Sequence, residues 1–264
     1  MIANSNMNKR TSTDIIVFVV LCFLILPMLV IPPTSLTDRP YLSFPKDHMS
    51  LVHYQDLIQS PDWRNAFLQS LLIAGCSSLL STAFGVLCTV GCWRLNNKFS
   101  IAIRALLIVP MIIPSIVYAL GIYKLWVDLG LFDTVIGVII AHTVTSIPYI
   151  ALTTSVALAS FDPSLERAAR NLGASAAQSL FRIVLPNIKS GVISGLIFAF
   201  MHSWDELVIV LFIAGSKIET LPRMIWNGIN DQLDPSISAV ATLLMLVSIG
   251  ALVLNLIVTR KPAA

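Results

Sequence analysis

The sequence has few charged residues. Asp, Glu, Lys and Arg make up 12% of its 264 residues, whereas hydrophobic residues make up 56%, and the mean hydropathy is +0.83. An average water-soluble domain has about 25% charged residues. The scarcity of charge therefore excludes a soluble enzyme and indicates a protein that lies mainly within a membrane.

Cysteine is scarce too, and the sequence motifs of several enzyme classes are absent. The cysteines all lie in apolar runs, without the paired spacing of a disulfide framework or a zinc site; they are Cys22, Cys76, Cys88 and Cys92. No G-x-x-x-x-G-K-[ST] segment is present to hold the phosphates of ATP. The H-E-x-x-H and G-x-S-x-G motifs are missing as well. We therefore expect a non-catalytic chain with no cofactor or metal of its own.

Long uncharged runs are abundant. Each of the runs at 15–37, 65–93, 105–123, 134–161 and 235–259 is long enough to cross a hydrocarbon core of about 30 Å as a helix. A sixth run, 190–216, is equally apolar except for Asp205 and Glu206 in its middle. The sequence therefore predicts a single all-α, polytopic membrane domain. Its six transmembrane helices are expected at about 13–33, 66–93, 103–124, 134–158, 190–215 and 236–259.

Basic residues are distributed unevenly over the predicted loops. If the N-terminus is cytoplasmic, most Lys and Arg residues fall in the inside segments, and most acidic residues fall in the external loops. The first apolar run is longer than an ordinary signal-peptide core and lacks a small-x-small cleavage site. We therefore predict an uncleaved first helix and a multi-pass chain with both termini in the cytoplasm.

The internal loop between the fourth and fifth predicted helices, residues 160–189, has the features of a helical hairpin. Asp162 can cap a helix that begins at Pro163, because proline needs no N–H partner there. Gly173 can adopt the left-handed conformation that ends a helix. Ser175, with a glutamine three residues later, offers a capping box for a second helix, which we expect to stop at or before Pro186.

The same loop resembles a known family. The spacing of Ala168-Ala169, Gly173 and Ile183-x-Leu185-Pro186 is similar to the signature cytoplasmic loop, called the EAA loop, of the permease subunits of bacterial ABC importers. The resemblance implies that the loop docks on a separate ATP-hydrolysing subunit, which would bind ATP and Mg²⁺. The implied docking residues are Glu166, Arg167, Ala168, Ala169, Arg170, Gly173, Ile183, Leu185 and Pro186.

One position departs from the family pattern. Arg167 occupies the usual glutamate position, and Glu166 lies one residue earlier. One residue corresponds to about 100° of rotation on a helix, so a charge contact made from that position in relatives cannot be transferred to this chain. The alternative interpretation of the loop is a hairpin that only packs on neighbouring helix ends.

Residues 60–260 as a whole resemble the spermidine/putrescine branch of these permeases. The similarity rests on Ala141-His142-Thr143, Ile147-Pro148-Tyr149, Ser203-Trp204-Asp205-Glu206 and Thr220-Leu221-Pro222, with Trp204 in place of an expected phenylalanine. It implies a small cationic amine as substrate, spermidine or putrescine first, although the branch also includes carriers of other small amines, amino-acid derivatives and opines. The implied partners are a second, different permease, an ATPase dimer and a periplasmic substrate-binding protein. The implied location is the bacterial inner membrane, and no nucleic acid is involved.

Asp205 and Glu206 are the charges inside the fifth predicted helix. A carboxylate at the centre of a lipid-facing helix costs about 2.5 to 3.5 kcal/mol, so both should face the interior of the bundle. There they can replace the hydration shell of a protonated amine, and an aromatic ring can stack on the same cation. We predict a translocation path that is lined by Asp205, Glu206, Trp204, His202 and Tyr149. The alternative is a structural network that holds helices together.

Two other classes of function account for parts of the sequence. In an ion-coupled secondary transporter, Asp205, Glu206 and His202 would form a proton relay, but the spacing in the 160–189 loop would have no explanation. In a membrane anchor for a cytoplasmic complex, the two carboxylates would have no transport role. The importer permease accounts for both the loop and the carboxylates, so we favour it.

Overall fold

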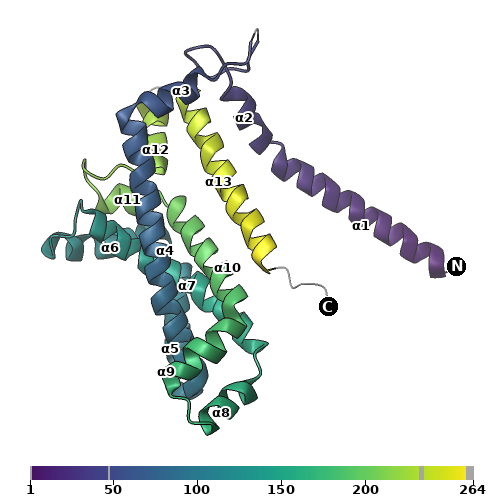
Figure 1. Cartoon of the computed structure of the whole chain (residues 1–264). Helices are drawn as coiled ribbons and strands as arrows, with labels where there is room; N and C mark the ends of the chain where they lie inside the picture. The colour runs from purple at the N-terminus through teal and green to yellow at the C-terminus, as the bar shows by residue number, and fades with distance from the viewer. Residues whose placement is uncertain (1, 47, 232–234, 260–264) are drawn as a thin grey trace. The chain divides into compact units, whose positions relative to one another are not determined.

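The structure is a computed structural model that describes residues 2–46, 48–231 and 235–259. Over these ranges it contains helices and connecting turns but no strand (Figure 1). Within the same ranges, four helical stretches are long and apolar enough to cross a membrane. They are α4 (Pro61–Leu95), α7 (Val135–Ala159), the stretch Ala176–Trp204 that ends as α10 (Leu185–Trp204), and α13 (Pro235–Thr259). The predicted all-α membrane fold is thereby confirmed.

Two further candidate spans are bent pairs of helices. The first consists of α1 (Ile2–Ile25), the 3₁₀ turn η1 (Met28–Val30) and α2 (Ile31–Thr34), with a bend of 44°. The second consists of α5 (Lys98–Ile112) and α6 (Ser115–Asp128), which meet at 104°. The described residues thus provide up to six spans if each pair crosses the membrane once.

The third helix expected at about 103–124 is divided into two helices in the structure. Ile113 has an extended backbone with ψ 125°, and the α5 helix ends there. The next residue is Pro114, whose ring disfavours the helical conformation in the residue before it. The chain therefore turns sharply between α5 and α6 instead of continuing as a single rod.

The chain divides into two compact units. The first comprises the described residues between Met1 and Arg64 and between Ile225 and Met245. Within it, the Tyr54 hydroxyl of α3 (Val52–Gln59) lies 2.7 Å from the Ser35 hydroxyl. The Thr34 hydroxyl donates to Ser238 Oγ over 3.3 Å and connects α2 with α13. Helix α12 (Leu221–Asp231) runs from the second unit into the first.

The second unit, Asn65–Met224 with the described residues from Leu246 on, holds the candidate site. One apolar cluster joins α4, α6, α7 and α11 (Val208–Ile213), with Ile73, Val138 and Ile213 among its buried members. A second cluster joins α4, α7 and α10 around Val86 and Ile150, together with other buried residues. Helices α4 and α7 contribute to both clusters and form the centre of this unit.

Helices α7 and α10 approach each other closely where α10 carries two glycines. A Cβ atom at Gly191 would lie 2.5 Å from the Ala157 Cβ and 2.7 Å from the Thr153 carbonyl oxygen. A Cβ atom at Gly195 would lie 2.5 Å from the Thr153 hydroxyl oxygen. Small residues at such positions let two membrane helices pack backbone against backbone.

The 160–189 hairpin connects these two helices. Asp162 accepts a hydrogen bond from the Ser164 N–H over 2.9 Å and caps α8 (Pro163–Asn171). The hydrogen bonds from the Ser164 hydroxyl and N–H hold the pKa of Asp162 below its ordinary value. Gly173 has φ +92°, and Ser175 forms a capping box with Gln178 at the start of α9 (Ala176–Ser179). These local predictions are confirmed.

The second helix of the hairpin does not stop before Pro186, so that part of the prediction is wrong. A π turn, η2 (Leu180–Val184), follows α9 and leads directly into α10. Its Leu185 N–H donates to the Leu180 carbonyl oxygen, five residues back. An α-helical turn at this place would bring the proline ring against the carbonyl four residues earlier, and the wider π turn avoids that contact.

Gly191→Ala should lower the stability of the fold by about 1–3 kcal/mol, because the added methyl group has no room against α7. The measurement is the denaturation midpoint of the detergent-solubilised protein. Gly250→Ala is the matched control, since nothing lies within 4 Å of a Cβ atom at that helical glycine. Equal midpoints for the two variants would show that α7 and α10 do not pack this closely.

Candidate functional site

Asp205 and Glu206 lie at a break between helices. Helix α10 ends at Trp204, where the Asp205 N–H donates to the Met201 carbonyl oxygen, and α11 begins at Val208. The prediction of a continuous helix over 190–215, with the carboxylates inside it, is therefore wrong. The residues on both sides of the two carboxylates do not reveal the break, because they are equally apolar in one long helix and in two shorter ones.

The Glu206 carboxylate is held at the start of two helices. One oxygen, Oε1, accepts from the Ile209 N–H of α11 over 3.1 Å, and Oε2 accepts from the Ser115 hydroxyl over 3.4 Å. Ser115 is the first residue of α6. The first N–H groups of a helix have no partner within the helix, so a carboxylate at this position satisfies one of them and is itself stabilised.

Four of the five predicted path residues come together around a hollow of about 280 Å³. Tyr149 of α7 and His202 of α10 lie side by side, with ring centroids 5.0 Å apart, and the Tyr149 hydroxyl is 3.5 Å from His202 Nδ1. The His202 Nε2 atom is buried without a hydrogen-bond partner among the described residues. The full lining is Tyr149, Phe198, Met201, His202, Asp205 and Glu206.

Trp204, the fifth predicted path residue, lies elsewhere. Its side chain is 2% exposed and does not line the hollow. The Phe200 ring stacks on it with centroids 5.6 Å apart, and the Phe67 ring meets it edge-on at 5.8 Å. A cation–π contact requires an accessible ring face, and these neighbours occupy the surroundings of Trp204. The structure therefore gives this residue a packing role.

Besides the Glu206 contacts with α6 and α11, a second polar network connects helices. The Ser203 hydroxyl lies 2.8 Å from His142 Nδ1 and accepts a hydrogen bond from the Ser77 hydroxyl over 2.9 Å. These three buried side chains connect α4, α7 and α10. The two carboxylates of the helix break take no part in the network.

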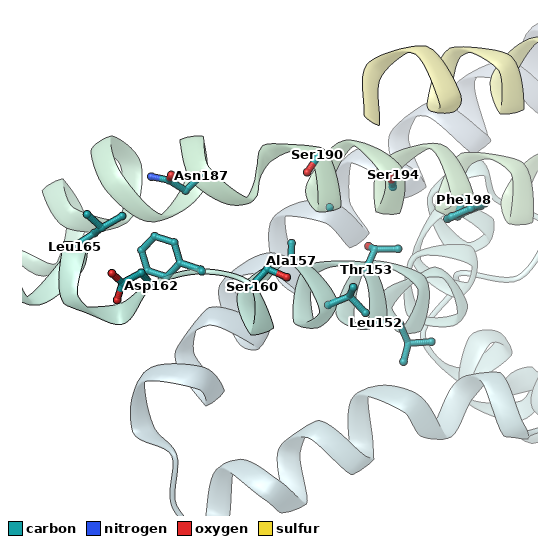
Figure 2. A pocket seen from close by; sticks show the side chains of 13 residues that line it. Leu152, Thr153, Ala157, Ser160, Asp162, Leu165, Asn187, Ser190, Ser194 and Phe198 are labelled. Atoms are coloured by element: carbon teal, nitrogen blue, oxygen red, sulfur yellow. The ribbon is translucent and has the colours of Figure 1, made fainter. Parts of the chain in front are cut away.

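A larger hollow of about 720 Å³ lies between α7 and α10, nearer the hairpin. Figure 2 shows Ser190 and Ser194 on α10 and Thr153 and Ala157 on α7 along its walls. Phe198 lines both hollows, so they are neighbours along α10. Sequence reasoning missed this part of the site, because its serines and threonines carry no charge that would mark them. The lining is Leu152, Thr153, Val156, Ala157, Ser160, Phe161, Asp162, Leu165, Asn187, Ser190, Gly191, Ser194 and Phe198.

The charged lining of both hollows has one sign. Among the described residues, Asp162, Asp205 and Glu206 are the Asp, Glu, Lys or Arg side chains that line them, so every one is an acid. The same part of the chain contains no group of three or more His, Cys, Asp and Glu that would hold a metal ion. The charged side chains at the two hollows are therefore all carboxylates.

Asp133 fixes the far end of α11. This residue has a positive φ of 55°, and its Oδ1 accepts from the Gly215 N–H over 2.7 Å and from the Lys217 N–H over 3.2 Å. Its own N–H donates to the Ile213 carbonyl oxygen over 3.0 Å. The turn before α7 thus holds the end of α11, and through this helix it also positions the Glu206 cap.

The predicted docking residues of the hairpin divide into exposed and buried sets. The exposed set is Arg167, Ala168, Arg170, Gly173 and Pro186. Ala169, Ile183 and Leu185 are half-buried, and the last two pack on the apolar cluster around Val184. Sequence reasoning missed three apolar side chains at the exposed surface of the hairpin, namely Leu165, Leu172 and Phe181.

Glu166 points into the protein. It is 7% exposed, and its Oε1 lies 2.6 Å from Arg94 Nη2 at the end of α4. The Ser179 hydroxyl donates to the same oxygen over 2.8 Å. Glu166 is therefore buried, whereas Arg167, one residue later, is exposed.

Permeases of several known transport systems are similar to this chain in sequence. The permease PotC of the spermidine/putrescine transport system of Haemophilus influenzae is 29% identical over 245 residues, which cover 92% of this chain and 95% of the relative. The permease PotI of the putrescine transport system of Escherichia coli K12 is 30% identical over 203 residues, or 73% of this chain and 71% of the relative. The permease CysT of the E. coli K12 sulfate transport system is 29% identical over 216 residues, or 76% and 78%.

Solved structures share the fold. A bacterial ABC transporter involved in the import of the acidic polysaccharide alginate aligns with a TM-score of 0.69 at 17% identity, covering 96% of each chain. The MetNI methionine ABC transporter in an inward-facing conformation aligns with a TM-score of 0.63 at 17% identity, covering 80% of this chain and 100% of that one.

The sequence model of one family, described as the binding-protein-dependent transport system inner membrane component, matches residues 81–261. The matched range contains the hairpin and both hollows, and it makes up more than half of the chain. The resemblance that was stated from the loop spacing is confirmed. The chain thus belongs to the family of inner-membrane components of binding-protein-dependent transport systems.

Proposed function

We propose that this chain is the permease subunit of an ATP-driven importer for a small cationic amine, with spermidine or putrescine as the first candidates. The observation that carries the proposal is the acidic lining of the two hollows between α7 and α10. PotC and PotI, whose names specify spermidine and putrescine, support a cationic substrate. CysT, whose name specifies sulfate, has similar identity, so the lining charge is the better guide to the substrate.

The geometry suits an ammonium group. Such a group donates hydrogen bonds and needs oxygen acceptors in place of water. Asp205 is exposed, and Glu206 is held rigidly at its helix cap, so both supply carboxylate oxygens at the helix break. Tyr149 adds a hydroxyl and an aromatic ring beside them. Towards the hairpin, the hydroxyl groups of the larger hollow provide further acceptors.

The hairpin provides the coupling surface in this proposal. Its exposed residues include three arginines, Arg167, Arg170 and Arg182, and two apolar side chains, Leu172 and Phe181, which are 90% and 65% exposed. A partner with an apolar groove and acidic groups at its rim would bind this surface. A cytoplasmic ATPase dimer that carries ATP and Mg²⁺ is that partner, and a second, different permease would complete the path.

The proposed cycle is alternating access. A periplasmic binding protein delivers the amine, and ATP-driven closure of the ATPase dimer moves the hairpin and opens the path outward. ATP hydrolysis then returns the path to its inward-open state. This arrangement requires the hairpin and both termini to lie in the cytoplasm, with the chain in the inner membrane.

Replacement of both carboxylates, Asp205→Asn with Glu206→Gln, should reduce uptake of labelled putrescine at least about tenfold, because each charge-assisted hydrogen bond contributes about 1.5–3 kcal/mol. The measurement is uptake by the reconstituted transporter, and the assembly is checked by co-purification. Asp128→Asn is the control, since that exposed acid pairs with Lys124 away from both hollows. Unchanged uptake in the double variant would remove the carboxylates from the path.

Gly173→Val should release the ATPase or uncouple its hydrolysis from uptake, because a β-branched residue at φ +92° costs about 1–3 kcal/mol and alters the turn. Co-purification of the ATPase and substrate transported per ATP are the measurements. Gly130→Val, which imposes similar strain at φ +67° in a turn remote from the hairpin, is the matched control. Normal coupling in the Gly173 variant would contradict the docking assignment.

Uptake that survives loss of the ATPase but collapses with an uncoupler would indicate an ion-coupled transporter.

A further inference from the structure

Arg94, in the last turn of α4, contacts both helices of the hairpin. Its Nη2 atom lies 2.6 Å from Glu166 Oε1 on α8 and donates to the Ala176 carbonyl oxygen on α9 over 3.2 Å. The arginine side chain is 24% exposed and the glutamate side chain 9%. One guanidinium group therefore joins α4 to both arms of the hairpin.

One oxygen of the glutamate in this contact has a second partner within the protein. Glu166 Oε1 also accepts a hydrogen bond from the Ser179 hydroxyl over 2.8 Å, and Ser179 is 0% exposed. A buried carboxylate without a counter-charge is strongly unfavourable, so α8 cannot move away from α4 without breaking a costly contact. The ion pair thus holds α8 against α4 more firmly than a surface salt bridge would. We call this contact between Arg94 and Glu166 the joint.

Apolar contacts surround the joint on the same elements. Trp93, next to Arg94, meets the Phe161 ring edge-on with centroids 5.7 Å apart, just before α8. Leu180 of the π turn packs in the same cluster as Val90 of α4. The end of α4 is therefore attached to the hairpin both before α8 and after α9.

Helix α4 can carry a displacement from this joint to the substrate site. It is one continuous helix from Pro61 to Leu95. Ser77, 17 residues before Arg94, hydrogen-bonds Ser203, which lies two residues from Asp205. At 1.5 Å per residue, roughly 26 Å of helix separates the joint from the polar network beside the helix break.

We propose that Arg94 is the positioning residue through which movement of the hairpin reaches α4 and, through α4, the helix break. The inference rests on the proposed function, in which an ATPase moves the hairpin. Glu166 then acts within the chain, and the exposed Arg167 is left to face the partner. In this chain Glu166 serves transmission and not docking.

The test uses the complete reconstituted transporter with its partner subunits. Arg94→Gln and Glu166→Gln should retain the ATPase but lower the substrate transported per ATP at least about fivefold, the size of a typical coupling between sites. The exchanged pair, Arg94→Glu with Glu166→Arg, should restore part of the loss. Arg104→Gln is the matched control, because this neighbouring arginine donates to the Cys92 carbonyl of α4 without touching the hairpin, and its ratio should not change.

The outcomes separate this inference from the proposed function. A wild-type chain that retains no ATPase would overturn the proposed function itself. Normal transport per ATP in both single variants, with a coupled wild type, would overturn only the role of Arg94. If the single variants do not assemble, Arg94→Lys decides, because it keeps a positive charge beside Glu166 and removes the guanidinium group that joins α4 to both arms of the hairpin. A lowered ratio with the ATPase retained in that variant supports transmission, and an unchanged ratio rules it out.

Discussion

The close contact between α7 and α10 is the packing around which both hollows of this chain are arranged. Gly191 and Gly195 bring the two backbones together, and Thr153, the residue that they meet, also lines the larger hollow. Side chains of these two helices form most of the walls of both hollows. The hydroxyl groups of Thr153, Ser190 and Ser194 line the larger hollow beside this close approach, together with apolar side chains such as Phe198. The position of the carboxylates, the hairpin and the end of α4 all depend on this packing.

A helix that is interrupted inside a membrane leaves backbone N–H groups without partners in the helix, and the break after Trp204 provides other partners for them. Backbone N–H groups cannot turn to water there and must find partners in the protein. At this break Glu206 supplies one such partner, and Asp133 secures the other end of the short helix that follows. The same carboxylate thereby has two tasks, since it completes the backbone of α11 and presents negative charge to the hollow. A substitution at Glu206 consequently needs a readout of folding beside its readout of transport.

Sequence reasoning succeeded for features that depend on residues close together in the sequence. The uncharged runs located the spans, and the caps at Asp162 and Ser175 depend on neighbours within three residues. It failed where the partner of a side chain is distant in the sequence, or where a break in a helix leaves the composition of the segment unchanged. Glu166 finds its partner 72 residues earlier, at Arg94, and Trp204 is enclosed in part by Phe67. Four of the five predicted path residues line one hollow, because they lie on a short stretch of α7 and at the end of α10 and the break that follows it.

Because the π turn at Leu180–Val184 leads directly into α10, the length of the hairpin affects its orientation relative to that helix. Residues from Ala176 to Trp204 form one helical stretch, so no loop separates the hairpin from the glycines that meet α7. One residue added to or removed from a helix rotates everything beyond it by about 100°. A change in length within this stretch would therefore turn the exposed arginines of α8 relative to the face of Gly191. Loops of many proteins tolerate insertions. Here, however, the number of residues between α8 and Gly191 fixes the direction in which the exposed side of the hairpin points.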